Sequence, residues 1–92
     1  MIKPCKIELT EVQKDLGKVP RYIKEKLLLW VDAVERMGIQ RVRKIPGFHD
    51  EPLKGDRKGQ RSIRLSKHYR AIYVANENSA LLKVIEVNKH EY

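Results

Sequence analysis

Two adjacent runs near the middle of the sequence alternate between apolar and polar side chains. In residues 62–66 the apolar side chains are Ile63 and Leu65, and residues 70–74 alternate in a similar way. Alternation at period two is typical of half-buried strands, and the polar break at residues 66–68 fits a hairpin between them. The sequence therefore predicts a stiff two-stranded platform, on which arginines of the outer parity are held in place.

Residues 21–37 have the longest helical pattern. Their apolar side chains recur at steps of three and four residues and form one core-facing stripe: Ile23, Leu27, Trp30, Val31, Val34 and Met37. Gly38 follows as a natural C-terminal stop. A shorter helix is predicted at residues 10–17, where Thr10 and Gln13 have the spacing of a capping box. The short connection between the two helices predicts an antiparallel helical hairpin.

The rest of the chain adds a first strand, a long loop and a last strand. Residues 5–9 alternate and predict a short edge strand, whereas residues 39–59 have no sustained periodicity and predict a long functional loop. Residues 76–79 are a turn cluster, and residues 81–87 are apolar at nearly every position, which is typical of a central strand covered on both faces. The predicted fold class is α+β, a single domain over residues 1–92, with an N-terminal helical hairpin packed on one face of a small antiparallel sheet and the other face open.

Basic residues are concentrated on the predicted loop and hairpin. The chain of 92 residues has a formal net charge of +8, and residues 39–73 contain ten Lys or Arg against three Asp or Glu. A focused positive field of this kind suits a polyanion, most often a nucleic acid. A contact with an acidic protein partner, or a solubilising role, is the alternative that charge leaves open.

The residue types present disfavour several classes of site and location. Cys5 is the only cysteine, so no internal disulfide is possible, and the reducing cytoplasm is the expected location. No apolar run approaches the length of a membrane span and no signal-peptide pattern begins the chain, so no membrane partner is expected. His49, His68 and His90 lie on separate segments, which matches no usual metal-ligand spacing, and no glycine pattern fits a nucleotide-binding loop. No metal or cofactor is therefore expected.

The side chains around the basic stretch are sufficient for cleavage of RNA without a metal. That reaction needs a base for the ribose 2′-hydroxyl, cations for the phosphate and an acid for the departing 5′-oxygen. Glu, Lys, Arg, His and Tyr are all present to supply these groups. Arginine suits the phosphate because its planar fork binds two oxygens at once. DNA lacks the 2′-hydroxyl and would not react by this route.

Four segments give the sequence a recognisable pattern. They are residues 51–57 (Glu-Pro-Leu-Lys-Gly-Asp-Arg), 62–65 (Ser-Ile-Arg-Leu), 69–73 (Tyr-Arg-Ala-Ile-Tyr) and 90–92 (His-Glu-Tyr). Together they resemble the RelE/ParE superfamily, the toxins of bacterial type II toxin–antitoxin modules, and most of all its ribosome-dependent RNase branch of HigB-like and YoeB-like toxins. The first half of the chain matches in layout only. The resemblance implies a RelE-like microbial RNase fold.

The resemblance also implies a function, partners and catalytic residues. The protein would enter the ribosomal A site, cut the mRNA there, inhibit translation and be neutralised by a cognate antitoxin that wraps it. Glu51 falls where these toxins place a general base, and Arg70 where they place a phosphate-binding arginine. His90 and Tyr92 fall in the tail that supplies the acid or an orienting group. Glu91 lies between them, which departs from both named branches and leaves the identity of the acid open.

The remaining basic side chains of this region are expected to bind the RNA backbone. These are Lys54, which the resemblance places near the phosphates, together with Arg57, Lys58, Arg61 and Arg64. Each candidate also has an ordinary structural explanation, because loop cations can form a solvated rim and strand arginines can pair with nearby carboxylates.

Three functions remain open on the sequence alone. The first is a ribosome-dependent mRNA endonuclease. The second is a ParE-like toxin of the same fold that poisons DNA gyrase without cutting RNA. The third is a basic module that binds RNA or a protein and catalyses nothing. Only the first requires the carboxylate of Glu51 and the guanidinium of Arg70.

Overall fold

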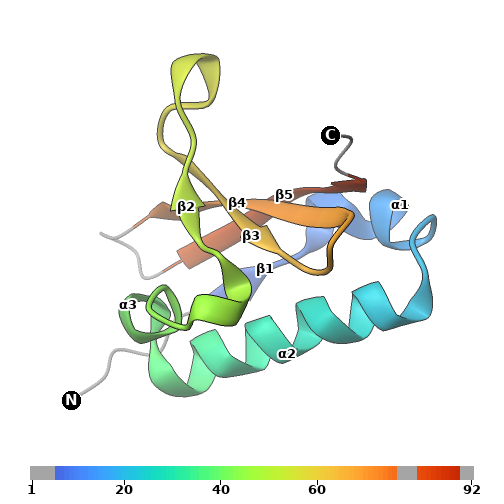
Figure 1. Cartoon of the computed structure of the whole chain (residues 1–92), viewed down its shortest axis with the longest axis horizontal. Helices are drawn as coiled ribbons and strands as arrows, with labels where there is room; N and C mark the ends of the chain where they lie inside the picture. Colours follow the sequence, from blue (N-terminus) through green and yellow to red (C-terminus); the bar gives the residue numbers. More distant parts are fainter. Residues whose placement is uncertain (1–5, 77–80, 90–92) are drawn as a thin grey trace.

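The computed structural model describes residues 6–76 and 81–89, which fold into a five-stranded sheet with helices packed against it (Figure 1). The strands are β1 (Lys6–Glu8), β2 (Glu51–Pro52), β3 (Gln60–Arg64), β4 (Tyr69–Asn76) and β5 (Leu81–Lys89). The helices are η1 (Thr10–Val12), α1 (Gln13–Leu16), α2 (Arg21–Met37), α3 (Ile39–Val42), η2 (Pro46–Phe48) and η3 (Gly55–Arg57), of which the η helices are 3₁₀ turns. The strand order is β1-β5-β4-β3-β2. The α+β class and the β3–β4 hairpin are therefore as predicted.

The sheet is mixed and not antiparallel throughout. β1 is an edge strand, as predicted, but it runs parallel to β5, with Ile7 opposite Leu82. The other three pairings, β2 with β3, β3 with β4 and β4 with β5, are antiparallel. The prediction of a purely antiparallel sheet was wrong because alternation along a strand specifies which face is buried and not the direction of its neighbour.

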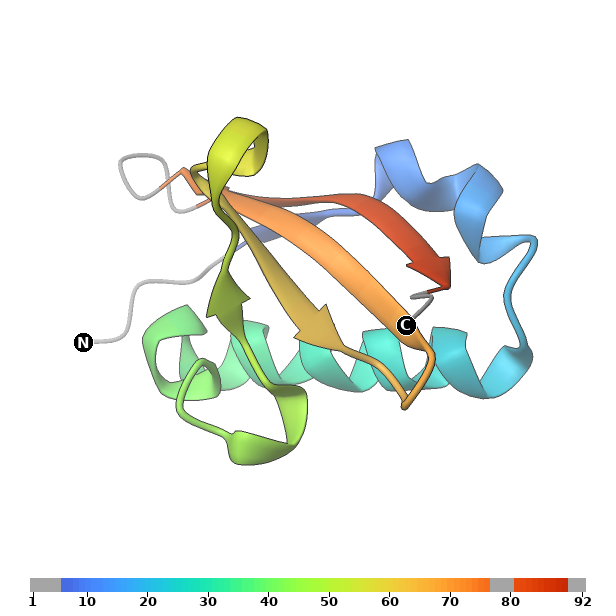
Figure 2. The same ribbon diagram turned by 45° about the horizontal axis from the view of Figure 1, so that its top comes forward.

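α2 has the bounds that its apolar stripe predicted, and it runs along one face of the sheet (Figure 2). Ile23, Leu27, Trp30 and Val34 are fully buried in a core shared with the strands. Burial of each such side chain stabilises the fold by about 1.5–3 kcal/mol. Gly38 ends the helix with a φ of 86°, a conformation that glycine adopts without a steric penalty. In the described part of the chain, no helix is long and apolar enough to cross a membrane.

The predicted helical hairpin is not confirmed. α1 packs against β5, where the carboxylate of Asp15 accepts a 3.1 Å hydrogen bond from the backbone N–H of Val87. β1 covers β5 only along residues 81–83, so α1 takes the place of a strand beside the later half of β5. No side-chain cap begins α1; the Gln13 amide instead donates to the Leu9 carbonyl at 3.1 Å.

Residues 39–59 are more structured than their lack of periodicity predicted. The segment contains four short elements, α3, η2, β2 and η3. Phe48 is buried at the end of η2, with the Lys26 ammonium 4.9 Å from its ring centroid, which ties this segment to α2. His49 follows with a φ of 46°, a left-handed conformation that turns the chain sharply into β2. These contacts join residues that are distant in sequence, so no pattern within the segment predicts them.

β5 lies inside the sheet, as predicted, but only one of its faces is covered. Leu82, Val84 and Val87 are buried in the core, whereas Glu86 points to the opposite side. A register shift between Ile72 and Tyr73 of β4 lets both Val84 and Val87 face inward. The prediction of a strand covered on both faces was therefore wrong, and the uncovered face belongs to the site described next.

Candidate functional site

The face of the sheet opposite α2 carries a set of mostly polar side chains, which we call the open face. It is formed by the strand residues whose parity is opposite to that of the core: Glu51, Ser62, Arg64, Arg70, Ile72 and Glu86. The strand registers place Glu51, Ser62, Ile72 and Glu86 in one row across four strands. Arg64 and Arg70 are paired in the adjacent row.

Glu51 and Arg70 converge on the open face. Arg70 Nη2 lies 3.9 Å from Glu51 Oε1, and Arg70 Nη1 donates to Ser62 Oγ at 3.4 Å. The Glu51 side chain is 59% exposed and that of Arg70 is 22% exposed. The guanidinium is thus held at the floor of the site by two oxygen neighbours, while the carboxylate stays accessible. A carboxylate that can accept a proton thus lies beside a guanidinium that can bind an anion.

Arg64 adds a second guanidinium beside the first. It lies directly opposite Arg70 across the β3–β4 pair. Its Nε is buried and has no hydrogen-bond partner among the described residues. A buried donor without a partner and two neighbouring cations are both costly in the absence of an anion. The pair is therefore suited to a phosphate, which would accept from both side chains.

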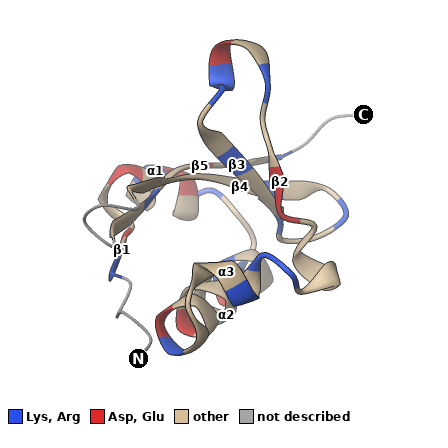
Figure 3. Ribbon diagram, turned by 90° about the vertical axis from the view of Figure 1, so that its left-hand side faces the viewer, with Lys and Arg blue, Asp and Glu red and all other residues tan. Residues whose placement is uncertain are grey.

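The β2–β3 connection, residues 53–59, carries further basic residues at the edge of the open face (Figure 3). Lys54 and Lys58 are exposed. Arg57 contacts Glu86 Oε2 at 2.5 Å and also donates to Gln60 Oε1 at 2.9 Å, so it links this connection to β5. Lys54 and Lys58 are placed to meet a polyanion from solvent, whereas Arg57 is already held by a carboxylate.

Arg61 does not lie with these cations. Its Nε donates to Asp50 Oδ1 at 2.6 Å, on the core side of the sheet, and the Asp50 side chain has no solvent exposure. The Tyr73 hydroxyl donates to Asp50 Oδ2 at 2.6 Å, and Arg43 Nε donates to that hydroxyl at 3.2 Å. The parity of β3 explains the difference, because Arg61 and Ile63 share the inward face. We therefore assign Arg61 a structural contact, in place of the predicted position on the RNA-binding rim.

Burial and hydrogen bonding alter the protonation of this inner cluster. Burial raises the pKa of Tyr73 to about 12; the bond from Arg43 opposes this rise and the charge of Asp50 reinforces it. For Arg61, burial alone would lower the pKa, but the hydrogen bond and the charge of Asp50 outweigh it and raise the pKa. Both groups thus keep the protons that they donate to Asp50.

Sequence reasoning missed four side chains that organise this region: Asp50, Ser62, Tyr73 and Glu86. No local pattern predicts the contact between Asp50 and Tyr73, because 22 residues lie between them along the chain. The one available signal was the inward parity of Tyr73, since a buried phenol needs a hydrogen-bond partner. No comparable signal pointed to Glu86 as the partner of Arg57.

The histidines and the tail complete the predicted set. His49 is exposed at the left-handed turn, and His68 is exposed in the β3–β4 turn, where its backbone N–H donates to Ser66 Oγ at 3.2 Å. His90 and Tyr92 lie outside the described residues. Asn88, at the end of β5, pairs in register with Arg70, so the described part of the chain ends beside the Glu51–Arg70 pair.

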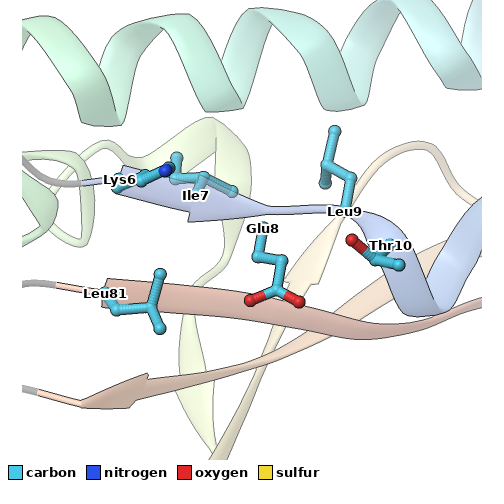
Figure 4. A pocket seen from close by; sticks show the side chains of 6 residues that line it. All are labelled: Lys6, Ile7, Glu8, Leu9, Thr10 and Leu81. Atoms are coloured by element: carbon cyan, nitrogen blue, oxygen red, sulfur yellow. The ribbon is translucent and has the colours of Figure 1, made fainter.

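A pocket lies at the far edge of the sheet, away from this site (Figure 4). It is lined by Lys6, Ile7, Glu8, Leu9, Thr10 and Leu81. β1 and β2 are the two opposite edges of the sheet, so the pocket lies at the edge farther from Glu51. Within residues 6–76 and 81–89, no three His, Cys, Asp or Glu side chains cluster as metal ligands.

Comparison with known proteins identifies solved structures with a similar fold. No protein-family model matches the sequence, and no curated protein matches it. A chain of the archaeal RelE–RelB complex from Pyrococcus horikoshii is 22% identical over 95% of this chain and 96% of its own length, with a TM-score of 0.72. The YoeB/ParE toxin from Agrobacterium tumefaciens is 22% identical over 94% and 99%, with a TM-score of 0.67. A chain of the YoeB–YefM complex from Staphylococcus aureus is 18% identical over 98% and 100%, also with a TM-score of 0.67.

These likenesses extend over nearly the whole of each chain, so they include the sheet, α2 and the β2–β3 connection together. The chain therefore has the fold of the RelE, YoeB and ParE-like toxin proteins.

Proposed function

We propose that this protein is the toxin of a type II toxin–antitoxin module and that it cleaves mRNA in the ribosomal A site. The observation that carries the proposal is the convergence of Glu51 with Arg70 and Arg64 on an open, basic sheet face. The fold supports it, because similar solved structures are described as RelE–RelB and YoeB–YefM complexes. A cognate antitoxin is the partner that these complexes suggest for this chain.

The proposed chemistry is attack by the ribose 2′-oxygen on the neighbouring phosphorus. Glu51 takes the 2′-hydroxyl proton, the new O–P bond forms and the bond to the 5′-oxygen breaks. Arg70 and Arg64 neutralise the phosphate oxygens, whose charge grows in the transition state. A proton must reach the departing 5′-oxygen, and His90 or Tyr92 is the proposed source. Lys54 and Lys58 hold the backbone of the RNA beside the site.

The ribosome is the proposed source of substrate geometry. The open face offers cations and a base, and the Glu51 side chain is 59% exposed. A flexible single strand would seldom present its 2′-oxygen in line with the scissile bond. An mRNA held in the A site is already constrained, which removes much of that orientational cost.

Induced expression with mapping of RNA ends tests this function. Wild type is compared with Glu51→Gln and Arg70→Ala, with Arg36→Ala as the control; Arg36 is an exposed arginine that pairs with Asp32 on α2. We expect wild type and the control to arrest growth and to produce new 5′ ends within translated codons. Both site variants should lose these ends while remaining folded.

Two outcomes contradict the proposal in different ways. Growth arrest with intact mRNA and a DNA-damage response, unchanged in both site variants, would indicate a gyrase poison. Harmless expression of a folded protein in the absence of any antitoxin would indicate a binding module without activity.

A further inference from the structure

A buried cluster lies directly beneath the Glu51–Arg70 site, on the other side of the same strands. Asp50, Arg61 and Tyr73 each immediately precede or follow a residue of the open-face row that contains Glu51, Ser62 and Ile72. We infer that Asp50 is a positioning residue, which fixes Glu51 against Arg70 through the sheet. This inference rests on the proposed function, in which Glu51 is the base.

β2 needs such a clamp because its own pairing is minimal. It has two residues, both exposed, and it is the edge strand of the sheet. Its pairing consists of Glu51 opposite Ser62 and Pro52 opposite Arg61, followed by one hydrogen bond from Leu53 N to Gln60 O at 2.9 Å. Proline donates no backbone hydrogen bond, and short edge strands open easily. Backbone pairing alone would therefore leave the Glu51 carboxylate poorly fixed.

The Asp50 carboxylate supplies the missing restraint. Its two oxygens accept 2.6 Å hydrogen bonds from two different strands, from Arg61 Nε of β3 and from the Tyr73 hydroxyl of β4. The side chain has no solvent exposure, so water does not compete for either oxygen. The residue before Glu51 is thus attached to the same two strands that carry Ser62 and Arg70.

The far side of the clamp is rigid as well. The Tyr73 ring packs on Trp30 of α2 with centroids 5.0 Å apart and an interplanar angle of 48°. Arg43 Nε donates to the same hydroxyl from the segment after α3. His49, at a φ of 46°, turns the chain so that Asp50 faces inward and Glu51 outward. The packing of the core therefore fixes the position of Asp50, and through one peptide unit it also fixes the backbone of Glu51.

The test is a double-mutant cycle between Asp50 and Glu51. Asp50→Asn keeps the shape but leaves one oxygen, which accepts from only one of the two donors. Asp32→Asn is the matched control, since Asp32 also accepts from an arginine Nε, at 2.9 Å, but on the exposed side of α2. Single-turnover cleavage is measured at saturating protein on ribosomes programmed with mRNA, in the wild-type and the Glu51→Gln backgrounds.

We expect Asp50→Asn to slow cleavage roughly tenfold to a hundredfold, the cost of a small misplacement of a reacting group. In the Glu51→Gln background the same change should have less than about a twofold effect, because no base remains to be positioned. RNA affinity and the Asp32→Asn control should stay within about twofold of wild type. An equal loss of rate in both backgrounds, or no loss in either, would overturn the inference.

The variant Tyr73→Phe and amide hydrogen exchange provide two further tests. They distinguish loss of the clamp from misfolding, and failure of the clamp from failure of the proposed function. Tyr73→Phe keeps the contact with Trp30 and removes one donor, so it should show the same dependence on Glu51 with a smaller loss. In both variants the Leu53 amide should exchange faster while the amides of β4 and β5 stay protected. An inactive wild type would refute the proposed function, and a Leu53 amide that exchanges as slowly in Asp50→Asn as in wild type would refute the clamp.

Discussion

Arg70 is the residue whose side chain joins the two halves of the site. One of its terminal nitrogens faces the Glu51 carboxylate at 3.9 Å and the other donates to Ser62 at 3.4 Å. A lysine at this position keeps the charge but has a single ammonium, which cannot contact both neighbours and a phosphate in one plane. The geometry of the guanidinium, and not only its charge, is therefore expected to matter.

Arg70→Lys should lower the single-turnover cleavage rate roughly tenfold to a hundredfold, with little change in RNA affinity. Lys58→Ala, on the exposed β2–β3 connection, should lower affinity and leave the rate at saturation unchanged. Both quantities are measured on programmed ribosomes, one from the rate at saturating protein and the other from its concentration dependence. Equal losses of rate in the two variants would contradict the division of roles.

Tyr73 makes the stability of the protein depend on alkaline pH. The unfolded chain loses the phenolic proton near 10.0, whereas burial raises the pKa of the folded residue to about 12. The contribution of this shift is therefore fully present below pH 10 and is lost as the pH rises to about 12. A shift of this size is worth roughly 2–3 kcal/mol in the free energy of unfolding.

Tyr73→Phe should remove this dependence. The variant is expected to be less stable than wild type at neutral pH by about 1–3 kcal/mol, because Asp50 loses a buried donor. The difference in the free energy of unfolding should shrink between pH 10 and pH 12. In this range only the wild type loses stability, because its unfolded chain releases the Tyr73 proton at a lower pH than the folded protein does. Denaturant unfolding of both proteins across this range measures the difference. A gap that stays constant would show that the hydroxyl is not protected from ionisation.

For single residues, the sequence predicts the face of the sheet that a side chain occupies where this face follows from its parity along the strand. Arg64 and Arg70 were expected on the outer face of the hairpin, and the register places them there, opposite each other. Arg61 was misplaced because it was grouped with its neighbours by charge, although it shares the parity of Ile63. Asp50 was missed because both of its partners are distant in sequence and their contacts arise only when β2 docks.

Secondary-structure elements were predictable in proportion to the length of their pattern. α2 has 17 residues and a continuous apolar stripe, and its bounds agree with the prediction. β2 has two residues and α1 has four, too few for a periodicity to be read. The position of α1 depends on the free flank of β5 and on one hydrogen bond from Val87 to Asp15. Such tertiary placements have no local signature.

The η3 turn shows how an element can be held in place by one side-chain contact. Arg57 reaches Glu86 on β5 at 2.5 Å, and Glu86 also accepts from the Asn88 amide at 3.0 Å. Gly55 begins the turn and Gly59 follows it, with φ values of 66° and 95°, conformations that side chains disfavour. The ion pair is partly exposed, so its contribution to stability should be below about 1 kcal/mol. Its larger effect is to occupy one cation and one carboxylate of the open face.

Glu86→Gln should therefore raise the affinity for RNA without destabilising the fold. The substitution releases Arg57 and removes a negative charge from the row that contains Glu51. The slope of log affinity against log salt should steepen by about 0.7, the value of one further phosphate contact on a single strand. Glu35→Gln, the same change on the exposed face of α2, is the control. Equal effects in the two variants would show that net charge alone is responsible.

For the molecule as a whole, the two faces of one sheet separate the hydrophobic core from the proposed site. The inner face joins α2 in a core that contains Trp30 and Tyr73, and the outer face gathers Glu51, Arg64 and Arg70. Adjacent strand residues belong to different faces, so neighbours in sequence have unrelated roles. A substitution on the inner face should consequently affect mainly unfolding and one on the outer face mainly cleavage, with the hydrogen-bonded pair Asp50 and Tyr73 as the exception that couples the two.

The distribution of charge, more than its total, should determine how this molecule meets RNA. Lys54 and Lys58 are exposed on the β2–β3 connection, whereas Lys14 and Lys18 are exposed at and after α1, a helix that lies apart from that connection in Figure 1. Replacement of either lysine pair by glutamine lowers the net charge by the same amount. Lys54 and Lys58 lie on the connection between β2 and β3, the two strands that carry Glu51 and Arg64, so this pair is expected to release counterions when RNA binds to the open face.

The double variant Lys54→Gln/Lys58→Gln should bind a short, uncleavable single-stranded RNA roughly tenfold more weakly than wild type at moderate salt. Its slope of log affinity against log salt should be shallower by about 1.4, since two phosphate contacts are lost. The double variant Lys14→Gln/Lys18→Gln should stay within about twofold of wild type and keep the wild-type slope. Titrations at several salt concentrations measure both quantities. Equal losses in the two variants would mean that RNA is attracted by the whole molecule, and would contradict the proposal that the open face is the binding surface.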